Sequence, residues 1–129
     1  MTNITTVSIE KTTSKRIYDL EERTYQFAKR VRIFIKNLPN TISNIEDSKQ
    51  VVRSSGSIGA NYIEANESLS KKDFIMRIKI CRKESKESAY WLRMIKEINE
   101  QYQKGEIDFL FNEAIELKKI FSSIIEKSS

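Results

Sequence analysis

The sequence has 129 residues, of which 39% are hydrophobic and 32% are charged, and its formal net charge is +5. That length suits one domain with its own core, and three glycines and one proline supply too few turns for a fold of many strands. No run approaches the roughly 20 apolar residues of a membrane span, and the first residues lack the apolar run of a signal peptide, so we expect a cytoplasmic protein without a membrane partner.

The first amphipathic pattern covers residues 17–38. We expect residues 1–15, which are aperiodic and rich in Thr and Ser, to be a flexible leader, and residues 16–129 to be a single domain. Apolar side chains at steps of three and four predict a helix that Pro39 ends. Its core stripe is predicted to be Leu20, Thr24, Phe27, Val31, Phe34 and Leu38. A basic set follows the same spacing on another face: Lys29, Arg32 and Lys36.

Residues 43–69 form the second predicted helix, which begins with a capping box at Ser43 and Glu46. Its apolar positions are Ile45, Val52, Ile58, Tyr62, Ile63 and Leu69. Its middle holds Gly56, Gly59 and several serines, so a loop is the alternative, but the apolar spacing continues in phase on both sides and favours a helix. The small side chains then predict close approach of another helix. A lone Gly-x-x-Gly without a strand and a lysine does not indicate a phosphate loop.

Residues 71–103 are the longest regular stretch, without glycine or proline and preceded by the capping residue Ser70. Its predicted core seam is Phe74, Ile78, Cys81, Ser85, Ser88, Leu92, Ile95 and Tyr102. A second apolar strip lies beside the seam: Met76, Ile80, Trp91, Met94 and Ile98. Basic residues recur every seventh position on the far side: Lys72, Lys79, Lys86 and Arg93. Three more side chains belong to that basic face or its edge: Arg82, Lys83 and Tyr90.

Residues 108–127 form the last predicted helix, and Gly105 is expected to stop the preceding one. Its seam is Leu110, Ala114, Leu117, Phe121 and Ile124. Short links between four helices predict an all-α, up-down-up-down antiparallel four-helix bundle. Residues 15–38 and 71–104 carry +4 and +5, whereas the segment after each carries −2. Helices adjacent in the sequence are therefore expected to attract one another.

The second apolar strip of residues 71–103 predicts a closed homo-oligomer. One stripe per helix fills a bundle core, and an exposed strip that contains Trp91 and two methionines is typical of an interface. The alternative is a monomer in which residues 108–127 cover both strips.

The charged residues near the apolar strips point to structure and not to a reaction centre. The absence of histidine excludes Ser-His-Asp and Cys-His catalysis, and it leaves Glu64, Glu84 and Glu87 with too few partners for a two-metal site. We expect Arg53 to pair with at least one of these glutamates, within or between subunits, because an unpaired charge beside an apolar strip is costly. The alternative partner for the glutamates is a cation of another subunit. The sequence therefore predicts no enzyme, no metal and no cofactor.

The basic face predicts binding to RNA or DNA with little sequence specificity, because cations would contact phosphates while Tyr90 stacks on a base. For one monomer, a solvated helix face is the simpler interpretation. Several copies in an oligomer would concentrate the charge and attract polyanions with a strong salt dependence. The competing function is a structural or adaptor oligomer that binds a protein partner, with the basic charge serving solubility.

Three stretches together resemble a known family. They are residues 18–39, which contain YDLE, FAKR and LP; residues 53–65, RSSGSIGANYIEA; and residues 72–92, which contain KDFI and end in ESKESAYWL. They are similar to small bacterial four-helix-bundle proteins first identified as products of intervening sequences in large-subunit ribosomal RNA genes, and to accessory proteins of diversity-generating retroelements. The resemblance covers nearly all of the chain after residue 16.

The resemblance implies a four-helix bundle that assembles into a homopentamer. For the retroelement branch it also implies binding to nucleic acid and to a reverse transcriptase. The family has no catalytic residues that could be carried over to this sequence.

Overall fold

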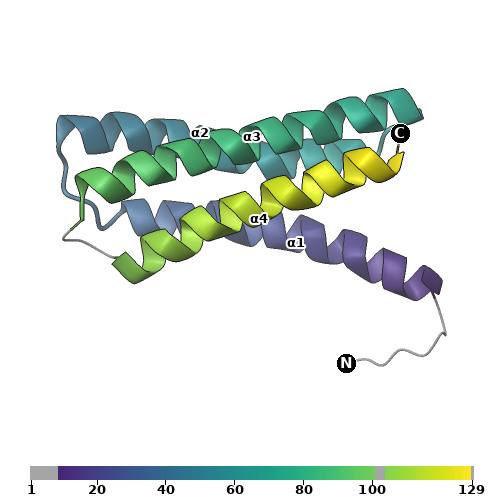
Figure 1. The fold of residues 1–129 in the computed structure, drawn as a ribbon, viewed down its shortest axis with the longest axis horizontal. Helices are drawn as coiled ribbons and strands as arrows, with labels where there is room; N and C mark the ends of the chain where they lie inside the picture. Colours follow the sequence, from purple (N-terminus) through teal and green to yellow (C-terminus); the bar gives the residue numbers. More distant parts are fainter. Residues whose placement is uncertain (1–8, 101–103, 129) are drawn as a thin grey trace.

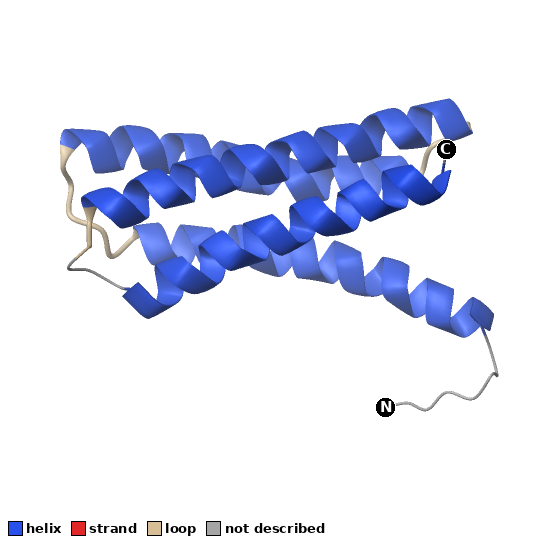
Figure 2. Ribbon diagram, viewed as in Figure 1, coloured by secondary structure: helices blue, strands red, loops and turns tan. Residues whose placement is uncertain are grey.

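The computed structural model describes residues 9–100 and 104–128, with side chains described for residues 19–100 and 105–128. It contains four helices, α1 (Ile9–Ile35), α2 (Ile42–Asn66), α3 (Lys71–Ile98) and α4 (Lys104–Ser128). The part of the chain that the structure describes has no strand (Figure 2). The helices form the predicted all-α, up-down-up-down antiparallel bundle (Figure 1). Because α3 packs against α2 and α4, and α1 does the same, α1 and α3 occupy diagonal corners.

The predicted core stripes of three helices are buried. Every member of the stripe of α1 is buried, and so are six members of the seam of α3. Of the other two, Phe74 is partly buried and packs against the core, and Tyr102 lies outside the described residues. In α4, four seam residues are buried and Ile124 packs at the edge of the core. Periodicity therefore identified the inner faces of α1, α3 and α4 correctly.

The core of α2 differs from the prediction. Of its six predicted apolar positions only Ile58 and Tyr62 are buried, and Leu69 lies beyond the helix with 99% of its surface exposed. The buried residues of α2 are Asn44, Val51, Ser54, Ser55, Ile58, Tyr62 and Ala65. Most of these side chains are small or polar, so a search for large apolar residues does not find this face.

Three helices begin at positions other than the predicted ones: α1, α2 and α4, and the last of these begins at Lys104 and not at residue 108. α1 begins at Ile9, so residues 9–15 are helical and the prediction of a flexible leader is wrong for them. A helix extends through polar residues at little cost once it has formed. α2 begins at Ile42, and its cap is Thr41 and not Ser43. The Thr41 side-chain oxygen accepts a hydrogen bond from the backbone N–H of Asn44 at 3.2 Å.

α3 begins after the predicted cap, Ser70, but ends earlier than expected, at Ile98. The side-chain amide of Asn99 donates to the carbonyl oxygen of Ile95 at 2.8 Å. It also exchanges two hydrogen bonds with the amide of Asn44, both 2.8 Å long. This buried pair ends α3 and ties it to the first turn of α2. Gly105 lies in the first turn of α4, so it is not the predicted stop signal.

Candidate functional site

The candidate site is the solvent-facing side of α3, between its two flanking helices. On the side of α4, Lys96 forms an ion pair with Asp108 at 2.7 Å. On the side of α2, Glu84 and Glu87 pair with Arg53. The predicted basic face lies between these contacts and points away from the core.

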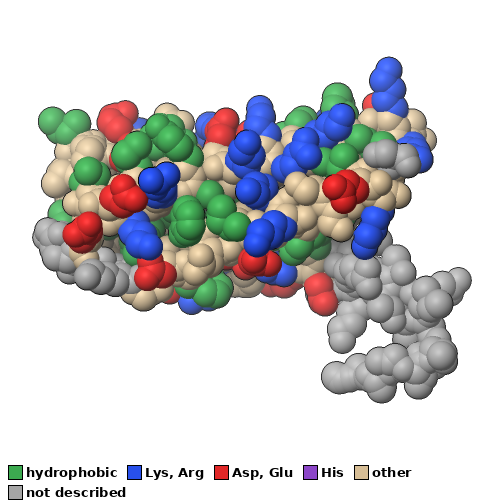
Figure 3. Space-filling view, in the orientation of Figure 1, with side chains coloured by type: hydrophobic (Ala, Val, Ile, Leu, Met, Phe, Trp, Pro, Cys, Tyr) green, Lys and Arg blue, Asp and Glu red, His purple; other side chains and the backbone are tan. Residues whose placement is uncertain are grey.

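The basic row of α3 comprises Lys72, Lys79, Lys86 and Arg93, all of which are exposed. Arg93 forms an ion pair with Glu97 at 3.1 Å. The three lysines have no ion-pair partner in the described part of the chain. Seven helical residues rise about 10.5 Å, so the row is a regular ladder of positive charge. Figure 3 shows lysine and arginine side chains gathered along α3, with few acidic ones among them.

The other predicted members of this face differ in their solvent exposure and in their contacts. Lys83 is exposed, and its amine lies 3.9 Å from the carboxylate of Glu84. Arg82 is partly buried. Tyr90 is 57% exposed, and its ring meets that of Trp91 edge-on at a centroid distance of 4.9 Å.

The basic residues of α1 do not join those of α3. Lys29 and Lys36 are exposed, but they stand at the opposite corner of the bundle. The guanidinium of Arg32 donates to the carbonyl oxygens of Ala28 at 3.0 Å and Val52 at 3.2 Å, so it reaches across to α2. The predicted nucleic-acid-binding residues therefore form two separate basic edges, with the net-acidic helices α2 and α4 between them.

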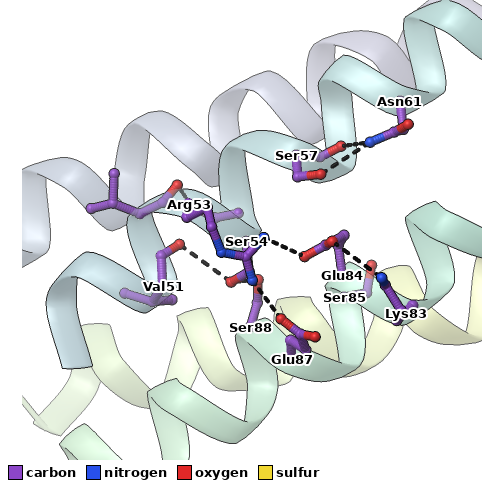
Figure 4. A network of polar contacts seen from close by, with 12 residues as sticks. Val51, Arg53, Ser54, Ser57, Asn61, Lys83, Glu84, Ser85, Glu87 and Ser88 are labelled. Atoms are coloured by element: carbon purple, nitrogen blue, oxygen red, sulfur yellow. Dashed lines mark hydrogen bonds and ion pairs between the residues drawn. The ribbon is translucent and has the colours of Figure 1, made fainter. Parts of the chain in front are cut away.

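Arg53 is paired, as predicted, and Figure 4 shows the contacts. Its guanidinium donates to Glu84 at 3.3 Å and to Glu87 at 2.5 Å. The side chain of Glu84 is only 7% exposed, whereas those of Arg53 and Glu87 are 52% and 42% exposed. Glu64, the third predicted partner, is exposed and forms no ion pair with Arg53. The cluster therefore joins α2 to α3.

The second apolar strip of α3 lies beside α2, since the glutamates within it bind Arg53. Met76 and Ile98, at the two ends of the strip, are 50% and 58% exposed. The other members are partly buried: Ile80, Trp91 and Met94. The alternative in which residues 108–127 cover both strips is therefore not the arrangement of this chain.

The two glycines of α2 lie inside the helix, so the loop alternative is wrong. A Cβ atom at Gly59 would lie 3.0 Å from the hydroxyl of Thr24 and 3.7 Å from its backbone carbonyl carbon. A Cβ atom at Gly56 would lie 3.0 Å from the guanidinium of Arg32. The expected close approach is confirmed, and the approaching helix is α1.

The single cysteine is part of the core and not of a reactive site. The thiol of Cys81 is fully buried and donates to the carbonyl oxygen of Ile58 at 3.4 Å. Burial raises the pKa of this thiol to about 12, so it stays protonated and unreactive near neutral pH. Within the described residues, no three Cys, Asp or Glu side chains are grouped to hold a metal ion.

The sequence reading missed the contacts that hold α1 against α4. Arg23 binds Glu113 at 2.6 Å and Arg30 binds Glu106 at 2.7 Å. The guanidinium of Arg30 also lies 3.8 Å from the ring centroid of Phe109. The opposite net charges of these two segments were a signal for attraction, but they did not identify the pairs.

Comparison with known proteins agrees with this architecture. A family model described as 23S rRNA-intervening sequence protein matches residues 17–123. A crystal structure of a protein of unknown function from the S23 ribosomal protein family of Bacteroides thetaiotaomicron is 33% identical and superposes with a TM-score of 0.73. That match covers 81% of this chain and 96% of the other. No curated protein matches the chain.

Proposed function

This chain belongs to the 23S rRNA-intervening sequence protein family, and from that premise we propose that it is a non-catalytic, oligomeric accessory protein that binds nucleic acid. The observation that carries the proposal is the three lysines of the α3 row that have no ion-pair partner among the described residues. Arg23, Arg30 and Arg53 are each matched by a carboxylate. The three row lysines are not matched in the described structure, so their charge is available to phosphate oxygens. Recognition of phosphates carries little sequence information.

The test replaces the unpaired row lysines together: Lys72, Lys79 and Lys86 to Ala. Each phosphate contact that is lost should lower the slope of log affinity against log salt by about 0.7–0.9. We expect the triple variant to bind RNA and DNA oligonucleotides at least about tenfold more weakly at low salt, measured by fluorescence anisotropy.

The matched control removes the same charge from lysines that already have acidic partners: Lys49, Lys96 and Lys119 to Ala. This variant should bind within about twofold of the wild type, because paired lysines have less charge to offer a phosphate. Equal affinity of the row variant and the wild type would contradict the proposal.

We propose that copies of the chain associate through the second apolar strip of α3. Met76 and Ile98 are half exposed on it, and a closed ring covers surfaces that head-to-tail contacts would otherwise leave open. We expect a particle of about five times the 15.1 kDa of one chain by light scattering. Several basic rows in one particle would strengthen binding to a polyanion.

The second candidate function is an adaptor oligomer whose apolar strip or ring face receives a protein partner, such as a reverse transcriptase. The half-exposed ends of the strip favour it. An oligomer that fails to bind nucleic acid at low salt would support this candidate over the first.

A further inference from the structure

A groove between α1 and α2 has no part in the function proposed above. Its volume is about 410 Å³. The residues that matter for its chemistry are Tyr25, Lys29 and Arg32 from α1, and Gly59, Ala60 and Ile63 from α2. It lies on the face of the bundle between α1 and α2, whereas the basic row is on α3, the helix diagonal to α1.

One wall of the groove carries an exposed aromatic ring. Tyr25 is 58% exposed, and it has neither a hydrogen bond nor a ring partner among the described residues. Ile63, which is 51% exposed, supplies an apolar side chain from α2. A tyrosine in such a position leaves its ring face available for stacking.

The groove also carries fixed positive charge. Lys29 is exposed one helical turn after Tyr25. Two carbonyl oxygens, those of Ala28 and Val52, hold the guanidinium of Arg32 over Gly56. A guanidinium already held in place loses less freedom when an anion binds to it. The one carboxylate in the lining, Glu21, is engaged by the amide of Asn66 at 2.8 Å.

We propose that this groove binds an unpaired base of single-stranded nucleic acid. The base stacks on Tyr25, and Lys29 and Arg32 contact the phosphates on either side of it. Exposed aromatic rings beside cations are the usual platform for single strands. The bases of a duplex are paired and stacked, so they cannot enter a groove between two helices. The inference rests on the proposed function and specifies its ligand as single-stranded.

The experiment compares three labelled probes on the full chain by fluorescence anisotropy. They are an oligothymidylate, an abasic oligomer of the same length, and a duplex of that length. The abasic oligomer keeps the phosphates and removes the bases. Wild-type protein should bind the oligothymidylate about five- to tenfold more tightly than the abasic oligomer.

Substitutions at Tyr25 then locate the preference. Tyr25→Ala should lose the preference for the oligothymidylate over the abasic oligomer, while its affinity for the abasic oligomer and the duplex stays unchanged. Tyr25→Phe should retain the preference because the ring remains. Ile33→Ala is the control, since Ile33 is 52% exposed on α1 and does not line the groove. Ala60→Leu, at an exposed position in the groove, should also lower affinity for the oligothymidylate alone.

The outcomes separate this inference from the proposed function. If no probe binds, the proposed function fails and this inference fails with it. If the oligothymidylate and the abasic oligomer bind equally, or if Tyr25→Ala retains the preference, only this inference is overturned. A smaller particle mass for Tyr25→Ala would also overturn it, because the groove would then be a contact between copies of the chain.

Discussion

The contacts that α2 makes and the contacts between α1 and α4 are built in opposite ways. Between α2 and α3, the buried hydroxyls of Ser54 and Ser88 lie 2.8 Å apart, and between α2 and α1 a glycine faces Thr24. Between α1 and α4, long side chains form partly exposed ion pairs such as Arg23–Glu113. Figure 1 shows α1 diverging from α4 toward its N-terminal end.

The difference shows that the stability of one bundle can depend strongly on side-chain size at one helix contact and weakly at another. Where small side chains bring two helices together, there is no room for an added group, and overpacking is costly. Where long charged side chains pair at the surface, each pair contributes little to the free energy of unfolding. Water solvates a side chain whose partner has been removed, so a substitution costs little. The substitutions that follow should therefore have unequal effects.

The largest effect is expected from Gly59→Leu. The new side chain would collide with Thr24 of α1 and should lower the free energy of unfolding by about 1–3 kcal/mol, measured by urea denaturation. Gly105→Leu is the control, since a Cβ atom at that position would meet no atom within 4 Å from another part of the described chain. It should be neutral or stabilising by up to about 1 kcal/mol, because leucine favours a helix more than glycine does. Equal stability of the two variants would contradict the size argument.

Arg53→Met should have the next largest effect. Among the described residues, it leaves the buried carboxylate of Glu84 with Lys83 alone, 3.9 Å away, and it should destabilise the fold by about 1–2 kcal/mol. Adding Glu84→Gln to the same chain should recover part of the loss, because the buried charge is then absent. Chemical denaturation of the single and double variants tests this. An unchanged unfolding midpoint for Arg53→Met would show that the cluster does not stabilise α2 against α3.

A smaller effect should follow from ionisation of Cys81. Burial raises the pKa of its thiol to about 12, while the unfolded chain loses this proton near its ordinary pKa of about 8.5. The stabilising contribution is therefore complete below that value and is lost as pH rises toward the folded pKa. Between pH 8 and pH 9.5 the free energy of unfolding should fall by about 1 kcal/mol from this group. In Cys81→Ala the free energy of unfolding should decrease less over this pH range. Identical pH profiles of the variant and the wild type would contradict a contribution from Cys81.

The smallest effect is expected at the contact between α1 and α4. A double-mutant cycle with Arg23→Ala and Glu113→Ala should give a coupling free energy below about 1 kcal/mol, and high salt should reduce it. The side chain of Arg23 is 42% exposed, so water competes with the pair. A coupling free energy that does not change with salt would show that this contact is shielded from water, like the buried contacts of α2.

The sequence by itself determined the fold class and most of the core. Apolar spacing identified the inner faces of α1, α3 and α4, because each turn of those helices places a large side chain against its neighbours. It also identified the basic row of α3 and placed Glu84 and Glu87 together beside the second apolar strip of that helix. These features are local, since residues three, four or seven apart on one helix share a face whatever surrounds them.

Tertiary structure decided the features that depend on two helices meeting. The buried face of α2 consists largely of small and polar side chains, which are buried only because α1 and α3 come close. The amides of Asn44 and Asn99, far apart in the sequence, meet at one end of the bundle and end α3 early. The basic edges of α1 and α3 are separate sites because those helices pack on diagonal corners. Periodicity states which face a residue occupies, but not which neighbour that face will meet.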